Sequence, residues 1–319
     1  NAHEMKYFST LMLVSRVVFG CENVIMGYKF KVQQNMKYNG RIYEMELKEL
    51  CKGIQLPQEA CGRVFEEYEK VNLAEMERQL NNLMERGTAE KAYHQLVNCL
   101  GKDPGNMKML MCQLVCACRD YDRYRELGIS DEIYFNTMKC FTRFLGERRE
   151  RTGEVLFDRG WWTYRQVSMT LFRIGELEYE LTAFEGKDAI SIHIPSDTAF
   201  IPEEVEESLR MAEDFIRRVY PEYVGAEYFC ESWLLSPRLA ELVKETSNIR
   251  KFQKRFVIKE DLPEDKEYME WLFGKTPDTP LEELPENTSL QRKAKVLLEN
   301  GGNLGAGVGI LTKTFTLEN

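Results

Sequence analysis

Apolar residues recur three or four positions apart through most of residues 43–149. This is the period of helices that bury one face. Gly87 and the turn at residues 103–105 separate successive helices. Residues 106–126 are apolar on nearly every side at their centre, which predicts a buried central helix, and residues 131–149 predict one further helix. The first half of the chain therefore predicts an all-helical domain.

Near residue 150 the pattern changes, and short apolar or alternating runs typical of strands appear. Residues 189–194 alternate apolar and polar side chains, as a half-buried strand does. Residues 171–174 and 177–181 predict two strands joined around Gly175. Further strands are expected at residues 228–234, 256–258, 271–273 and 309–311, and helices at residues 202–220, 237–244, 248–255 and 289–300.

These patterns predict an α+β (α/β) protein of two domains. An all-helical N-terminal domain covers residues 1–150, of which residues 1–40 are poorly patterned and end at the turn dipeptide Asn39-Gly40. A mixed-sheet domain covers residues 151–319. The length of 319 residues and the 43% hydrophobic content suffice for two cores.

Charge and composition narrow the function classes. The 43 basic and 52 acidic residues give a net charge of −9, which argues against a nucleic-acid partner. No run of about 20 apolar residues predicts a membrane span. The sequence has three histidines and neither an HxxxH nor a CxxC pair, so we expect no metal site.

The cysteines point to a compartment. Their number, nine, is odd, and most lie within helical apolar patterns, which favours buried free thiols in a reducing cytoplasm. Residues 7–19 are fairly apolar, but Arg16 interrupts them and no basic cluster precedes them. We therefore expect no signal peptide there.

Several short motifs occur in a fixed order in the second half. They include FDRGWWT at residues 157–163, FRIGELE at 172–178 and IHIPSD at 192–197, followed by SWLL at 232–235, SNI at 247–249, FQKRF at 252–256 and TSLQR at 288–292. In this order they resemble a bacterial two-domain acyltransferase family in which a helical N-terminal domain precedes a GNAT-like C-terminal domain. The resemblance covers roughly residues 40–315.

The resemblance implies a site and a reaction. In GNAT enzymes the central strand and the next strand separate, and acyl-CoA lies in the V between them. Residues 189–194 would be the central strand and residues 227–234 the next one, with the helix from Pro202 between them. Acetyl-CoA or another acyl-CoA would then be the cofactor and a small amine the substrate. The residues placed to bind the cofactor are Ile194, Ser196, Asp197, Thr198 and Asn248.

The loop at residues 195–202 departs from the family pattern. It has neither glycine nor a basic side chain, and four glutamates follow it within five residues. An anionic cofactor would meet repulsion there. A second hypothesis is therefore a catalytically inactive GNAT-like module that binds a small ligand or a protein partner. A third is a transferase that uses another acyl carrier, with phosphate contacts from the basic residues Arg250, Lys251, Lys254 and Arg255.

Three residues are candidates for catalysis. His193, on the alternating strand, is either a general base for an amine or a buried histidine bonded to a neighbouring strand. Glu178 shares a strand face with Glu180 and is either a base or part of a solvated face. Ser232 shares a face with Cys230, and either side chain offers a nucleophile, but the sequence shows no base for it.

Other motifs also carry two interpretations. Residues 196–198 either cradle a ligand or form a turn before a helix. Asn248 either presents its amide to a ligand or belongs to a helix cap. The glycine-rich run at residues 301–309 follows a helix and precedes a strand, so a helix end explains it better than a phosphate loop. Three tryptophans either line an acyl or aromatic pocket or belong to the core: Trp161, Trp162 and Trp233.

Overall fold

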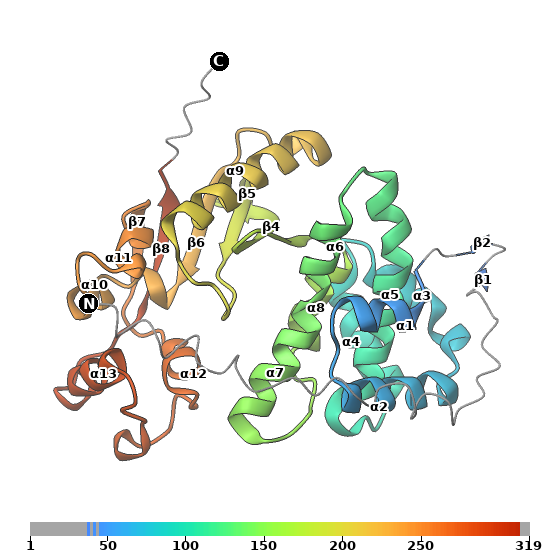
Figure 1. The fold of residues 1–319 in the computed structure, drawn as a ribbon, viewed down its shortest axis with the longest axis horizontal. Coiled ribbons are helices and arrows are strands. Elements are labelled where there is room, and N and C mark those ends of the chain that lie inside the picture. The colour runs from blue at the N-terminus through green and yellow to red at the C-terminus, as the bar shows by residue number, and fades with distance from the viewer. Residues whose placement is uncertain (1–36, 39–40, 43–44, 313–319) are drawn as a thin grey trace, which may run out of the picture. The chain divides into compact units, whose positions relative to one another are not determined.

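The computed structural model of the chain describes residues 37–38, 41–42 and 45–312 (Figure 1). The chain divides into two compact units, Asn1–Ile42 and Tyr43–Asn319. In the first unit, β1 (Lys37–Tyr38) pairs antiparallel with β2 (Arg41–Ile42). The apolar run at residues 7–19 and the Asn39-Gly40 dipeptide lie outside the described residues.

The second unit begins with helices packed around α5 (Met107–Glu126). Leu110, Leu114 and Cys118 of α5 are fully buried, which confirms the predicted central helix. The surrounding helices are α1 (Leu47–Gly53), α2 (Gln58–Lys70), α3 (Glu77–Leu83), α4 (Ala89–Leu100), α6 (Asp131–Met138), α7 (Cys140–Thr152) and α8 (Gly160–Val167).

The helical part differs from the prediction in two places. The single helix predicted over residues 131–149 is wrong, because the chain breaks at Lys139 into α6 and α7. At the end of α6, the Thr137 hydroxyl accepts a hydrogen bond from the Arg173 backbone N–H at 3.0 Å, so this end is tied to a strand. The sequence patterns also gave no sign of α8, which carries Trp161 and Trp162.

A six-stranded sheet follows, in the order β3-β4-β5-β6-β8-β7. Only the β5–β6 pair is parallel, and α9 (Pro202–Val219) connects these two strands. This arrangement confirms the predicted helical-then-mixed α+β fold (Figure 1). The strands are β3 (Leu171–Ile174), β4 (Leu177–Phe184), β5 (Lys187–His193), β6 (Glu227–Ser232), β7 (Phe256–Leu262) and β8 (Ala306–Leu311).

The two faces of β4 have different partners because side chains alternate along a strand. On one face, the Tyr179 hydroxyl lies 2.9 Å from the Ser208 hydroxyl of α9, and the Leu177 backbone N–H donates to the same hydroxyl. On the other face, Glu178 and Glu180 form ion pairs with arginines of α7 and α8. β4 thus turns Glu178 and Glu180 toward the helical part and places the buried Leu177, Tyr179 and Leu181 on the other face.

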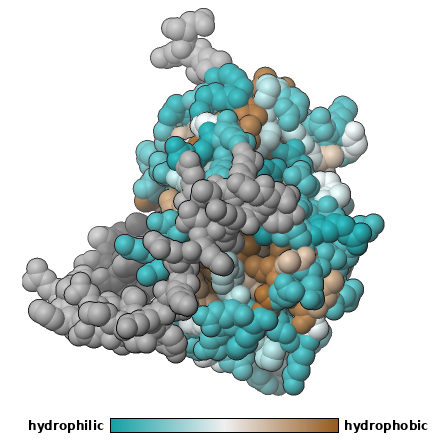
Figure 2. Space-filling view, turned by 90° about the vertical axis from the view of Figure 1, so that its right-hand side faces the viewer, coloured by the Kyte–Doolittle hydropathy of each residue, from teal (hydrophilic) through white to brown (hydrophobic). Residues whose placement is uncertain are grey.

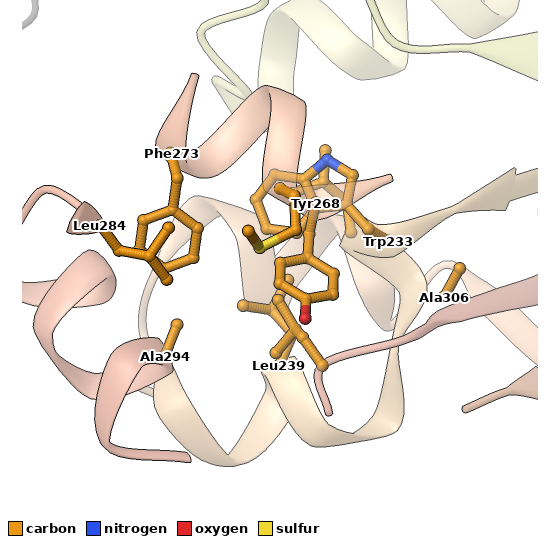
Figure 3. Packing of buried hydrophobic residues seen from close by; sticks show 10 residues of the cluster. Trp233, Leu239, Tyr268, Phe273, Leu284, Ala294 and Ala306 are labelled. Atoms are coloured by element: carbon orange, nitrogen blue, oxygen red, sulfur yellow. The ribbon is translucent and has the colours of Figure 1, made fainter. Parts of the chain in front are cut away.

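A second hydrophobic cluster lies beyond the end of β6 (Figure 3). Trp233, Tyr268 and Phe273 point into it, so Trp233 is a core residue. The strand predicted at residues 271–273 is wrong, because this segment ends α12 (Tyr268–Phe273), whose Tyr268 and Met269 face the cluster. The neighbouring helices are α10 (Pro237–Leu242), α11 (Asn248–Gln253) and α13 (Ser289–Glu299).

The glycine-rich run at residues 301–309 ends a helix and allows two chain segments to approach closely. Gly301 follows α13 in the left-handed conformation, with φ of 78°. Gly307, in β8, leaves room for the chain after β6: a Cβ there would lie 2.6 Å from the Leu235 carbonyl oxygen. The predicted helix end is confirmed, and the final strand begins at Ala306, three residues earlier than predicted.

The described surface in Figure 2 is mainly hydrophilic, with hydrophobic residues gathered in a few patches. None of the helices that the structure describes is both long and apolar enough to span a bilayer. The eight cysteines of the described part are free, and six of them are buried.

Candidate active site

The central strands separate next to His193. The β5–β6 register runs from Ala189↔Glu227 to Ser191↔Phe229 and stops there. On its other side, β5 stays paired with β4 as far as Glu178↔His193. Past Ser191, the edge of β5 that faces β6 therefore has no ladder partner. A gap between parallel strands at this point is the opening that the sequence resemblance implies for the acyl-CoA site.

His193 is held by a carboxylate on the neighbouring strand. Its Nε2 lies 2.7 Å from Oε2 of Glu180, and Nε of Arg165 lies 3.1 Å from Oε1 of the same carboxylate. The histidine side chain is 23% exposed and the glutamate side chain 16%. The imidazole is therefore oriented from behind while part of the ring remains accessible.

The charge of Glu180 decides which nitrogen of the imidazole carries the proton in their contact. Burial alone raises the pKa of this carboxyl, but the hydrogen bond from His193 and the nearby charges of His193 and Arg165 outweigh burial and lower it. An ionised carboxylate only accepts hydrogen bonds, so Nε2 carries the proton in this contact. When the ring is neutral, Nδ1 therefore carries the lone pair, and within the described part of the chain it has no hydrogen-bond partner.

An indole forms the wall beside this pair. The ring of Trp162 meets the His193 ring edge to face, with centroids 5.0 Å apart. The Arg165 guanidinium lies over the same indole, 4.5 Å from its centroid. Trp162 therefore limits how the imidazole can tilt, and it covers the cation that keeps Glu180 ionised.

Glu178, the other carboxylate proposed as a base, has a structural partner. Its Oε1 lies 2.7 Å from Nη2 of Arg143 on α7, and the two side chains are 3% and 12% exposed. The pair joins the sheet to the helical part. Glu178 lies opposite His193 in the register, yet the acid that bonds the imidazole is Glu180.

Ser232 and Cys230 lie at the end of β6 and are both buried. The Ser232 hydroxyl accepts a hydrogen bond from the Leu234 backbone N–H at 3.1 Å and so begins the short 3₁₀ helix that follows. Burial raises the pKa of the Cys230 thiol well above its usual range. Both side chains thus have structural surroundings, and a nucleophilic role for Ser232 stays a prediction.

The loop after β5 is tied down by its own polar side chains. Ser196 donates a hydrogen bond to Glu147, and Nη1 of Arg173 lies 2.8 Å from Oδ1 of Asp197. The Thr198 hydroxyl donates to the Glu176 carbonyl at 3.0 Å. The Thr198 N–H also donates to the Pro195 carbonyl, which closes the predicted turn. A ligand role for these three residues stays a prediction.

Apolar side chains fill the space where this loop enters α9. Phe200 has a left-handed φ of 56° and packs edge to face on Phe252, with centroids 5.3 Å apart. Phe200 and Ile194 also pack against the second hydrophobic cluster. Asn248 lies at the start of α11, capped by Ser247, and lines a cavity of about 10 Å³ with Phe200. That volume holds about one water molecule.

The basic residues near this cavity are largely engaged by glutamates. Nε of Arg250 lies 2.9 Å from Glu245, and Lys254 pairs with the same carboxylate. Arg255 pairs with Glu206 of α9. Lys251, which lines the cavity, forms no ion pair within the described residues. Over residues 45–312 and the two short strands, no group of three or more His, Cys, Asp and Glu side chains is placed to hold a metal ion.

Sequence reasoning missed the arginines that set these charges. Arg143 lies on a helix predicted with another boundary, and Arg165 lies on α8, which no pattern indicated. One signal was present: Trp161 and Arg165 stand four positions apart, which is about one helical turn.

The arrangement matches known proteins. A parallel strand pair that separates within a mostly antiparallel sheet is the arrangement that the sequence resemblance implies for a GNAT-like domain. A family model for the N-acyltransferase N-terminal domain matches residues 45–169, and one for the GNAT-like C-terminal domain matches residues 171–311. The chain belongs to the two-domain GNAT-like acyltransferase family. The domain boundary predicted near residue 150 stays a prediction.

Solved structures share this architecture. An acyltransferase in complex with decanoyl-CoA and teicoplanin has a TM-score of 0.70 at 21% identity, over 83% of this chain and 87% of that one. An acyltransferase mutant in complex with octanoyl-CoA has a TM-score of 0.71 at 20% identity, over 85% and 90%. An acyltransferase in complex with decanoyl-CoA has a TM-score of 0.61 at 23% identity, over 84% and 99%. No curated protein matches the chain.

Proposed function

We propose that this protein transfers an acyl group from acyl-CoA to an amine, with His193 as the general base. The observation that carries the proposal is the His193–Glu180–Arg165 arrangement at the point where β5 and β6 separate. A base must lie beside the reacting atoms and remain partly accessible, and His193 meets both conditions. The complexes of similar structures with decanoyl-CoA and octanoyl-CoA support acyl-CoA as the donor.

In the proposed reaction, the amine nitrogen attacks the thioester carbonyl carbon. A nitrogen–carbon bond forms, the carbon–sulfur bond breaks, and CoA leaves as its thiolate. The amine proton passes to Nδ1 of His193, since Nε2 already carries the proton donated to Glu180. Backbone N–H groups of β5 that face the gap polarise the carbonyl oxygen. Glu180 touches no reacting atom and acts as a positioning residue.

We expect acyl-CoA to require movement of Phe200, which fills the space where the loop after β5 enters α9. The cavity beside Phe200 is about 10 Å³, and an L-residue with positive φ is held there at a cost of about 1–3 kcal/mol. Replacing Phe200 with glycine removes both the side chain and this cost. We therefore expect Phe200→Gly to bind octanoyl-CoA more tightly than the unaltered protein in a calorimetric titration. Equal or weaker binding would mean that the donor enters elsewhere.

The direct test combines binding with turnover. The protein is titrated calorimetrically with octanoyl-CoA, and release of the CoA thiol is followed with an amine panel, beside His193→Ala and His94→Ala. His94, exposed on α4, is the matched control. We expect His193→Ala to keep donor binding and to lose about 10²- to 10⁴-fold in turnover. His94→Ala should behave like the unaltered protein. Equal losses in both variants would exclude His193 as the base.

The alternative function is the catalytically inactive module. It is favoured by the loop before α9, where neither glycine nor a basic side chain is present and Glu203 and Glu204 occupy the first helical turn. Under this alternative, octanoyl-CoA does not bind even at near-millimolar concentration. Saturable binding in the same titration rejects it.

A further inference from the structure

Two exposed indoles lie near one arginine where α8 begins. Trp161, in the first turn of α8, is 46% exposed, and Trp271, on α12, is 37% exposed. The Arg159 guanidinium lies over both rings, 5.7 Å from the Trp161 ring centroid and 5.6 Å from that of Trp271. Glu270 binds this guanidinium and also Arg151 of α7. We call Trp161, Arg159 and Trp271 the indole platform.

The indole platform is fixed by its surroundings. The Arg159 side chain is only 14% exposed and is held by Glu270 and by a third ring, Phe144, 5.9 Å away. The opposite side of α12 is buried in the cluster of Figure 3, where Tyr268 and Phe273 point inward. Trp271 therefore projects from a helix that cannot rotate to bury it. Two rigid indoles stay open to a ligand at little cost in conformational entropy.

The platform continues to the candidate base. Trp161 meets Trp162 edge to face with centroids 5.9 Å apart, and Trp162 meets His193 in the same way at 5.0 Å. One series of rings thus runs from the imidazole to the exposed surface. A substrate whose amine reaches His193 must lay the rest of its body along nearby surface. The apolar part of that surface is formed by indole faces and edges, which stack on flat rings.

We propose that the indole platform binds the acceptor through a rigid ring next to its amine. The inference rests on the proposed function, and it deepens it by naming the acceptor class. The shared chemistry is a ring face that stacks on an indole, which amino sugars and aromatic amines both offer. A linear alkyl amine of similar size offers no such face and gains less from the platform.

The first test is a comparison of acceptors at saturating octanoyl-CoA. Glucosamine, tyramine and n-hexylamine are compared by release of the CoA thiol. We expect at least one ring amine to have a KM roughly tenfold below that of n-hexylamine. Trp161→Leu and Trp271→Leu should remove this difference in acceptor KM and leave the KM for octanoyl-CoA unchanged. Trp161→Phe keeps a ring and should retain most of the difference. Leu127→Ala changes another exposed apolar side chain, after α5, and serves as control.

The second test measures acceptor binding without turnover, so it can fail or succeed independently of the proposed role of His193. Binding of the same amines to His193→Ala loaded with octanoyl-CoA is followed by tryptophan fluorescence, which requires no turnover. Ring amines that quench the signal, and cease to do so with Trp161→Leu added, support the platform even if His193 is not the base. The platform is rejected if n-hexylamine binds as tightly as both ring amines, or if neither leucine variant weakens their binding. A preference for glucosamine or for tyramine identifies the ring as a sugar or as an aromatic.

Discussion

At the scale of single residues, the contact between His193 and Glu180 links protonation to catalysis. The carboxylate accepts the Nε2 proton at 2.7 Å and leaves Nδ1 to act. Replacing Glu180 with glutamine removes the charge and permits the other tautomer. We expect Glu180→Gln to lower kcat/KM by about 10- to 100-fold, because the amide no longer fixes which ring nitrogen carries the proton. Steady-state assays of both forms measure the loss. An unchanged kcat/KM would show that Glu180 does not position the imidazole.

The same residue gives a prediction for stability. Its pKa is lowered in the folded protein, so the ionised form stabilises the fold. This contribution is fully present above the unfolded value of about 4.3 and disappears as pH falls through the lowered pKa. We expect Glu180→Gln to be about 1–3 kcal/mol less stable at pH 7, and the difference to shrink below pH ~4. Urea unfolding at several pH values measures it. A difference that grows on acidification would contradict the assigned shift.

At the scale of elements, β8 depends on close approach of the chain after β6. Gly307 has no space for a Cβ, which would lie 2.6 Å from the Leu235 carbonyl oxygen, whereas a Cβ on Gly62 in α2 would meet nothing within 4 Å. We expect Gly307→Ala to cost about 1–3 kcal/mol. Gly62→Ala should instead stabilise the protein by about 0.5–1 kcal/mol, because alanine favours the helix. Denaturant unfolding of both variants tests the contrast, and equal effects would refute it.

Most elements could be predicted because their patterns are local. The strand at Ala189 alternates apolar and polar residues in the sequence, although both of its faces are buried from Ala189 to Ile192 rather than one. The helix from Pro202 has a clear apolar stripe, and Thr288 and Gln291 form the capping box that the sequence indicated. The apolar run ending α12 was ambiguous, since three consecutive apolar residues suit a strand or a helix. Its state is set by Tyr268 and Met269 packing against residues far along the chain, which no local pattern shows.

At the scale of the whole described molecule, a buried ion pair connects α7 to the sheet. Arg143 and Glu178 are 2.7 Å apart and nearly inaccessible. We expect Glu178→Ala to destabilise the protein by about 3 kcal/mol, because buried Arg143 then keeps only the more distant carboxylate of Glu147, 3.7 Å away. Replacing both residues with methionine should restore most of this loss. Urea unfolding of Arg143→Met, Glu178→Met and the double methionine variant measures the coupling. A double variant as unstable as the sum of the single ones would show that the pair does not act as a unit.

The site was predictable only as far as strand alternation reaches. Alternation places Glu178 and Glu180 on one face and marks His193 as half-buried, and the structure agrees. Which carboxylate meets the imidazole depends on the β4–β5 register and on arginines from two helices. Register and helix packing are tertiary properties, so the pairing with Glu180, and the use of Glu178 in an ion pair, could not be inferred from spacing alone.

The most direct test of the account is the pH profile of acyl transfer by the unaltered protein and by His193→Ala, with octanoyl-CoA saturating and His94→Ala as control. With His193 as the base, the rate of the unaltered protein and of His94→Ala falls at acid pH. His193→Ala loses this acid limb and about 10²- to 10⁴-fold of the rate. An acid limb that persists unchanged in His193→Ala, at a similar rate, would show that another group takes the proton.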